Sequence, residues 1–291
     1  MITYKSRFLA HGEVWFDNEP DETRRVDWIT YHQRPRPVPG AKSRYFYTYV
    51  IDLNQSEEQL VARLNRDTAY KIRRARERDK ITCEFLDPND AAVMDRFEQM
   101  YNTFAAMKGL RPLYRARTEG FAAAGVLDLR AARDPQGEVL VYHANYRDRS
   151  RATGLELPSL YRASADSAER NRVGRANRYL VWSGILHYKE QGLQQFDFGG
   201  WYHGTDPAML RINEFKRGFG GEVQRGYECE QVLTLKGRLV MLAAAVLDRV
   251  KGRGTPLRPA PQRWAPTVDS TDVGATARGL PAYDETTALR G

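Results

Sequence analysis

Residues 196–201 read FDFGGW, and residues 211–222 read RINEFKRGFGGE. Each segment contains a glycine pair, and the dipeptide Phe215-Lys216 lies between the two pairs. Glycine leaves the backbone bare because it has no side chain, and a lysine adds a cation beside it. Bare backbone and a cation within one short region predict a site for an anionic or acyl-bearing substrate. A tight exit from a strand, where glycine accepts a positive φ, is the structural alternative for the first pair.

The composition is that of a folded protein with a polyanionic partner. The chain has 291 residues, 42% of them hydrophobic and 11% aromatic, which is enough for a sizeable core. Its formal net charge of +8 favours nucleic acid, a phosphorylated substrate or a membrane surface as partner. The longest apolar run, residues 239–247, is too short to cross a bilayer, and the first residues lack an apolar signal core. We therefore expect a cytoplasmic protein with no transmembrane segment.

Metal and serine-nucleophile chemistry have little support in the sequence. Cys83 and Cys229 are too few for a disulfide framework or a zinc site. The five histidines have no metal-ligand spacing, and no Gly-x-Ser-x-Gly elbow is present. His203, beside the first glycine pair, could contact substrate. No metal and no tightly bound cofactor are expected.

Hydrophobic periodicity predicts alternating strands and helices. One helix is expected from Ser56, with a buried stripe at helical spacing and a basic side. Strands are predicted over 45–52, 81–86, 126–132, 138–146, 152–157, 194–198 and 222–233, with one or two short ones around 14–16 and 28–31. Further helices are predicted from 89, over 118–124, over 175–191 and over 237–251. The turn 134–137 indicates an antiparallel hairpin.

This order predicts an α/β (α+β) fold, a mixed and largely antiparallel sheet flanked by helices. Residues 1–44 are interpreted as a short N-terminal extension, a partial subdomain, and residues 45–251 as the main domain. Residues 252–291 are rich in Gly, Pro, Thr, Ala and Arg and poor in large apolar residues. We expect them to form a flexible tail.

Two basic segments are candidates for binding phosphate. The helix segment 71–80 is either a phosphate-binding face or an ordinary solvated surface. Residues 170–177 are predicted to form a loop that opens the helix at Arg175, where backbone N–H groups could hold a phosphate; a capped polar loop explains them equally well. The candidate phosphate- or nucleic-acid-binding residues are Lys71, Arg73, Arg74, Arg172, Gly174 and Arg175.

Lys216 is the principal catalytic candidate, with Phe215 beside it. Phe215 and Phe219 flank the lysine, and Gly218, Gly220 and Gly221 are expected to leave its surroundings open. Such a lysine could bind phosphate or stabilise an oxyanion during acyl transfer, and the alternative is a lysine that faces solvent. The candidate substrate-binding residues are Asp197, Gly199, Gly200, Trp201, Arg211 and Arg115. Asp197 could orient an amine or bond to nearby backbone.

In combination, these segments resemble the Fem-type aminoacyltransferases. The resemblance rests on Asp52-Leu53, on YKIRRA at 70–75, on FDFGG at 196–200 and on FKRGFGG at 215–221, and it spans residues 45–235. Fem-type enzymes are tRNA-dependent and add amino acids to cell-wall precursors, and their relatives share a GNAT-type acyltransferase fold. The resemblance implies a GNAT-like domain over 45–251, with Phe215 and Lys216 near the acyl-transfer site and the basic helix facing a polyanion.

The chain also departs from the Fem pattern. Fem-type enzymes of the cell wall usually carry two GNAT-like units, and the segment before Tyr45 is too short for a complete first unit. A peptidoglycan precursor is therefore not carried over as the substrate. Residues 171–176 resemble the Gln/Arg-x-x-Gly-x-Gly/Ala pyrophosphate loop of acyl-CoA-dependent GNAT enzymes, with Asn171 in the first position. Acyl-CoA is therefore the alternative donor.

The resulting hypothesis is transfer of an aminoacyl group from aminoacyl-tRNA to an amine on a peptide, cell-envelope or natural-product precursor. Lys216 and backbone N–H groups would stabilise the tetrahedral oxyanion. The alternatives are an acyl-CoA-dependent N-acyltransferase and a non-catalytic protein on the same fold that binds RNA or phospholipid. The sequence does not indicate an oligomeric state.

Overall fold

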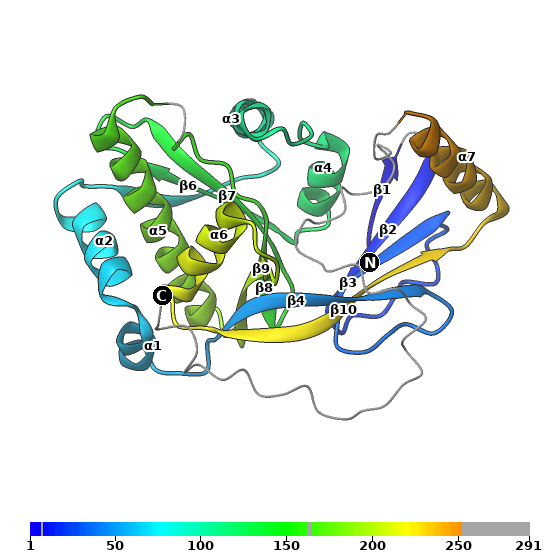
Figure 1. Cartoon of the computed structure of the whole chain (residues 1–291), viewed down its shortest axis with the longest axis horizontal. Helices are drawn as coiled ribbons and strands as arrows, with labels where there is room; N and C mark the ends of the chain where they lie inside the picture. The colour runs from blue at the N-terminus through cyan, green and yellow to red at the C-terminus, as the bar shows by residue number, and fades with distance from the viewer. Residues whose placement is uncertain (7, 162–163, 252–291) are drawn as a thin grey trace.

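The structure, a computed structural model, describes residues 1–6, 8–161 and 164–251. Within these residues, ten strands form one sheet in the order β1-β2-β3-β10-β4-β9-β8-β7-β6-β5 (Figure 1). Neighbouring strands are antiparallel except two parallel pairs, β2 with β3 and β8 with β9. The strands are β1 (Ile2–Ser6), β2 (Leu9–Trp15), β3 (Trp28–Arg34), β4 (Lys42–Asp52), β5 (Thr82–Leu86), β6 (Leu127–Arg133), β7 (Val139–Arg147), β8 (Arg151–Glu156), β9 (Gln195–Gly200) and β10 (Glu222–Val232).

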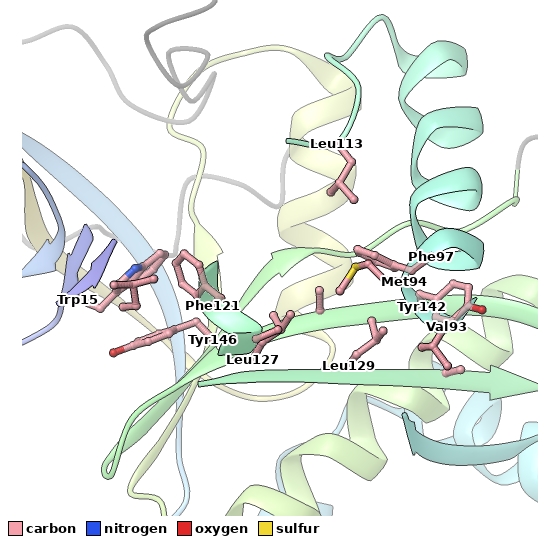
Figure 2. Packing of buried hydrophobic residues seen from close by; sticks show 14 of the residues in the cluster. Trp15, Val93, Met94, Phe97, Leu113, Phe121, Leu127, Leu129, Tyr142 and Tyr146 are labelled. Atoms are coloured by element: carbon pink, nitrogen blue, oxygen red, sulfur yellow. The ribbon is translucent and has the colours of Figure 1, made fainter. Parts of the chain in front are cut away.

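Helices cover both faces of the sheet. They are α1 (Glu57–Arg63), α2 (Arg66–Glu77), α3 (Ala91–Lys108), α4 (Arg115–Ala123), α5 (Ser167–Glu190), α6 (Pro207–Arg217) and α7 (Leu235–Lys251). On one face, α5 packs on β6, β7 and β9 and also contacts α2. On the other face, α3 and α4 pack on β6 and β7 through a core that includes Phe97, Phe121 and Tyr146 (Figure 2). The expected mixed, largely antiparallel sheet flanked by helices is confirmed.

The central hairpin forms as predicted. β6 and β7 pair in antiparallel register from Leu127 with Tyr146 to Arg133 with Val139. Asp134 closes the turn, because its carboxylate accepts hydrogen bonds from the backbone N–H groups of Gln136 and Glu138 at 3.0 and 2.9 Å. An aspartate at this position mimics a backbone turn, which is the signal that the sequence carries.

The expected single helix from Ser56 is wrong, because the chain forms two helices there. Ser56 begins α1 with a capping box that includes Gln59. Leu64 then leaves the helical conformation, and the side chain of Asn65 accepts a hydrogen bond from the backbone N–H of Thr68 at 2.8 Å. Asparagine competes for backbone hydrogen bonds and is therefore favoured as a new N-cap rather than inside a helix.

Two further helix predictions need correction. The helix expected from Arg175 begins at Ser167, where the Asp166 carboxylate accepts hydrogen bonds from the N–H groups of Ala168 and Glu169. Residues 170–177 are therefore helix and not a loop. Helix α6, which Asp206 caps and Pro207 begins, was not predicted. An aspartate followed by proline is a common helix start.

The N-terminal residues are more regular than expected. Three strands, β1 to β3, form where one or two short strands were predicted. They belong to the same sheet as the rest of the chain, because β3 pairs with β10 and β10 pairs with β4. The division into segments 1–44, 45–251 and 252–291 stays a prediction, and the predicted tail lies outside the described residues.

Candidate active site

The site lies where the parallel strands β8 and β9 part. Their pairing joins Arg151–Thr153 with Gln195–Asp197, while β8 continues to Glu156 and β9 to Gly200. Helix α5 is the crossover between these two strands, as parallel pairing requires. On its other side β9 remains paired with β4, where Thr48 lies opposite Gly200. The first glycine pair is therefore held by β4 beyond the point where the pairing with β8 ends.

Asp197 fixes this end of β9 from inside the protein. Its side chain is fully buried and accepts hydrogen bonds from the Thr48 hydroxyl, from the Gly199 N–H at 2.6 Å and from the Arg151 guanidinium at 2.5 Å. Both carboxylate oxygens are thus engaged within the protein. This geometry supports the alternative in which a strand-end aspartate bonds to nearby backbone, and orientation of an amine by Asp197 stays a prediction.

Gly199 adopts the conformation that the structural alternative for the first glycine pair requires. Its φ is +70°, in the left-handed region that side chains disfavour. This turn leads the chain to Trp201, whose N–H donates to the Tyr47 carbonyl at 2.7 Å. The Trp201 ring stacks on Tyr49 of β4 with 4.9 Å between centroids. Backbone turn and aromatic stacking together fix the direction of the glycine pair.

Lys216 lies in the last turn of α6, and only 6% of its surface is exposed. Its ammonium group donates to the carbonyl of Gly199 at 3.2 Å and to the carbonyl of Gly200. Burial lowers the pKa of Lys216 to about 7, because the charge of Asp197 offsets the desolvation only in part. The lysine that faces solvent is therefore excluded, and Lys216 can change its protonation state near neutral pH.

The expected open surroundings of Lys216 are wrong. The glycines that follow it allow close packing instead of exposure. A side chain on Gly221 would place its Cβ 2.5 Å from the carbonyl oxygen of Val50. Gly220 has a φ of +76° and packs against the backbone of Arg63. The glycine-rich segment packs tightly on α1 and β4, and this packing helps to bury Lys216.

Aromatic and cationic groups line the same region. Phe215 is partly buried and packs on Phe219, with 5.5 Å between ring centroids. The guanidinium of Arg178, from α5, lies 4.9 Å from the centroid of Phe215. Burial lowers the pKa of Arg178. Arg178 was not predicted as a site residue, because its position on α5 opposite Phe215 depends on tertiary packing.

Two of the substrate-binding candidates lie away from this cluster. Arg115 belongs to α4, and its guanidinium donates to the carboxylates of Asp95, Glu98 and Glu119. It forms a salt-bridge cluster between α3 and α4 rather than joining Lys216. Arg211 is exposed on α6, and its spacing from Lys216 places it on another side of that helix.

The phosphate-binding candidates on α5 lack the predicted geometry. Arg172, Gly174 and Arg175 lie within the helix, where backbone N–H groups bond to preceding carbonyls and are not available to an anion. Arg172 also pairs with Asp134 at 2.9 Å, and Arg175 pairs with Asp79 at 2.5 Å. The loop premise is wrong, although phosphate binding by these arginines is untested.

Helix α2 carries the other basic candidates, and its first residues contact the end of α6. The Asn65 N–H donates to the Gly218 carbonyl at 3.0 Å, which fixes the start of α2 against the end of α6. Arg73 is exposed, whereas Lys71 pairs with Asp67 at 2.7 Å and Arg74 donates to the Tyr70 hydroxyl at 3.1 Å. The exposed basic residues in and around α1 and α2 are Arg63, Arg66, Arg73, Arg76, Arg78 and Lys80.

Neither a metal-binding group nor a membrane-spanning helix is found among the residues that the structure describes. Over residues 1–6, 8–161 and 164–251, the His, Cys, Asp and Glu side chains form no group suited to hold a metal ion. Over the same residues, none of the helices has the length and apolar composition to cross a membrane.

Comparison with known proteins identifies the domain. Residues 62–217 match the family model described as "Acetyltransferase (GNAT) domain". The fold is similar to the crystal structure of FemX, with a TM-score of 0.53 and 14% identity over 67% of this chain. The match spans 63% of the FemX chain. No curated protein sequence matches this chain.

Two further solved structures are more distant. One is the DUF2156 C-terminal domain of a lysylphosphatidylglycerol synthetase candidate from Agrobacterium fabrum, with a TM-score of 0.48 and 16% identity over 75% of this chain and 72% of that chain. The other is L-PGS from Bacillus licheniformis, with a TM-score of 0.42 and 14% identity over 77% of this chain and 73% of that chain.

Proposed function

Since this chain belongs to the GNAT acyltransferase family, we propose that it transfers an aminoacyl group from aminoacyl-tRNA to an amine, with Lys216 as the catalytic cation. The observation that carries the proposal is the burial of this lysine at the point where β8 and β9 part. A cation in a low-dielectric environment interacts strongly with negative charge that develops during a reaction. Acyl transfer develops such charge on the carbonyl oxygen.

The reaction needs little from the protein beyond positioning. The lone pair of the acceptor amine attacks the carbonyl carbon of the aminoacyl ester, and a tetrahedral oxyanion forms. The C–O bond to the ribose then breaks, the ribose hydroxyl leaves with the proton of the amine, and an amide bond remains. The ester is already activated, so no side chain has to form a covalent intermediate. Lys216 in its ammonium form would stabilise the oxyanion.

The carbonyl groups of Gly199 and Gly200 give Lys216 a fixed position for this role. They accept hydrogen bonds from its ammonium group, and Asp197 in turn accepts a hydrogen bond from the Gly199 N–H. A preorganised charge loses little free energy to reorganisation when the transition state forms. Phe215 and the ring of Trp201 would limit the entry of water beside it.

The choice of tRNA as donor is supported by charge. The chain has a net charge of +8, and α2, which begins against the end of α6, carries exposed arginines. A long polyanion can contact many of these side chains at once, whereas a CoA pyrophosphate can contact few. Binding of tRNA should therefore weaken steeply with salt, because each phosphate contact releases counterions.

Acyl-CoA is the second candidate donor, because the matching family model is described as an acetyltransferase domain. The acceptor is proposed to be an amine on a peptide, cell-envelope or natural-product precursor, as the resemblance to Fem-type enzymes suggests. Binding of RNA or phospholipid without catalysis is the remaining alternative. It predicts that Lys216→Met leaves the affinity for RNA or phospholipid unchanged and that the wild type itself shows no transfer activity.

The donor can be identified by direct assay. Purified protein is incubated with aminoacyl-tRNA or with acyl-CoA, each with the same set of amines, and amide products are measured by mass spectrometry. We expect product from aminoacyl-tRNA that Lys216→Met abolishes and that Lys42→Met, a change at an exposed strand residue, leaves intact. Turnover of acyl-CoA alone would reject tRNA as donor. Tight RNA binding with no product from either donor would reject the catalytic proposal.

A further inference from the structure

Helix α7 carries a row of exposed apolar side chains. Leu235, Leu239, Leu242 and Val246 are 73%, 60%, 64% and 59% exposed. Their spacing places all four within roughly 60° of one another around a helix with about 3.6 residues per turn. Single exposed apolar residues are ordinary, but a continuous row marks an interaction surface. We call these four residues the α7 apolar row.

The opposite side of α7 faces the protein. Helix α7 lies beside the N-terminal strands, at the end of the molecule opposite α1 and α2 (Figure 1). The Thr234 hydroxyl donates to the Asp27 carboxylate at 2.7 Å, and a Cβ on Gly237 would lie 2.8 Å from the Asp27 carbonyl oxygen. Gly237 is buried and Val240 is partly buried. The helix is therefore fastened through one side and presents the apolar row on the other.

Basic residues accompany the apolar row. The α7 sequence holds four basic residues and one acidic residue, and Lys236 and Arg238 are exposed next to the row. Arg25, two positions before Asp27, is also exposed. An apolar row with flanking lysine and arginine side chains is typical of a helix that lies in the headgroup region of an anionic bilayer. A second copy of this chain would instead have to bring these like charges together.

From this combination we infer that α7 docks the protein onto an anionic lipid surface, with the α7 apolar row entering the headgroup region. Docking goes beyond the proposed transfer reaction and does not depend on it. The helix does not need to span the bilayer for this, because the row is a face and not a continuous apolar segment.

The test measures how the full-length protein partitions onto vesicles. We expect it to co-float with phosphatidylglycerol vesicles and to stay behind with phosphatidylcholine vesicles. The double variant Leu239→Glu/Leu242→Glu is expected to lower the partition coefficient at least about 100-fold, because two leucines leave the apolar phase and two negative charges oppose the lipid. The control Val61→Glu/Leu110→Glu also replaces two exposed apolar side chains by glutamate, at sites outside α7, and should keep the binding.

Several outcomes would overturn the inference. They are absence of wild-type binding to phosphatidylglycerol vesicles, equal binding by the α7 double variant, and a dimer in light scattering that the α7 variant converts to a monomer. Transfer to a water-soluble amine should be equal in the α7 variant and the wild type. Failure of the transfer assay with intact vesicle binding would count against the proposed reaction and not against docking.

Discussion

Replacement of Lys216 by methionine separates a catalytic lysine from a structural one. Methionine keeps the apolar stem of the side chain and removes its charge. Burial lowers the pKa of Lys216 from 10.5 to about 7, so the folded protein releases this proton at a lower pH than the unfolded chain. Between these two values the unfolded chain holds a proton that the folded protein lacks. The stability of the wild type must then rise with pH across that window.

The magnitude follows from the pKa difference. Between pH 6 and pH 9, Lys216 should raise the wild-type free energy of unfolding by about 3 kcal/mol relative to Lys216→Met. Other groups titrate equally in both proteins and cancel in the comparison. Urea unfolding followed by circular dichroism at both pH values measures this difference. Lys42→Met, at an exposed position, should shift stability by the same small amount at both pH values.

Activity provides the second half of the test. Loss of one preorganised group that stabilises an oxyanion lowers turnover by about 10²–10³-fold. We therefore expect Lys216→Met to lose transfer activity by about that factor while it becomes relatively more stable at low pH. A variant that keeps full activity, or a stability difference from the wild type that is constant between pH 6 and pH 9, would refute the assigned role of the buried ammonium group.

Four further predictions concern Asp197, His32, His143 and the exposed arginines of α2. Asp197→Asn should lower the free energy of unfolding by about 3–5 kcal/mol in urea titrations, because it leaves the largely buried guanidinium of Arg151, 13% exposed, without its counter-charge; a loss under 1 kcal/mol would contradict the role of Asp197 in fixing the end of β9. Burial alone would lower the pKa of His32, but the two carboxylates that face it raise this pKa to about 9. Protonated His32 should therefore add about 3 kcal/mol to the free energy of unfolding. This contribution should be complete below pH 6.5 and lost as the pH rises to 9. His143 has the opposite sign, because burial lowers its pKa to about 3; its contribution should be lost as pH falls from 6.5, and melts of His32→Gln and His143→Gln with equal pH slopes would refute both assignments. Arg73→Glu/Arg76→Glu should weaken tRNA binding and flatten its salt dependence, and an unchanged salt slope in filter binding would exclude α2 from the interface.

Local signals in the sequence were sufficient for most elements of the fold. The β6–β7 hairpin was predictable because Asp134 and Gly137 specify the turn and apolar residues fill both strands. The cap at Ser56 was also predictable, because a local side-chain hydrogen bond specifies it. The break at Asn65 was missed, because the hydrophobic stripe continues through it and periodicity alone cannot detect a second cap.

The candidate site was predictable in identity but not in environment. The glycine pair and Lys216 were singled out from composition, and the structure does bring Lys216 to the carbonyls of Gly199 and Gly200. The sequence could not show that later glycines pack against α1 and β4, because that contact joins segments far apart in the chain. Arg178 was missed for the same reason: it reaches Phe215 only through the packing of α5.

Comparison with other buried cations indicates why Lys216 is the group to test. The partly buried Arg117 and the buried Arg175 are held by carboxylates, as structural ion pairs usually are. Arg130 is buried and donates to the Leu180 carbonyl, with its guanidinium 5.5 Å from the centroid of the Tyr188 ring. Lys216 combines burial, contacts with carbonyl oxygens and a pKa of about 7, so it can change charge under working conditions. Perturbed groups of this kind concentrate at functional sites, because their burial costs stability that a purely structural role would not require.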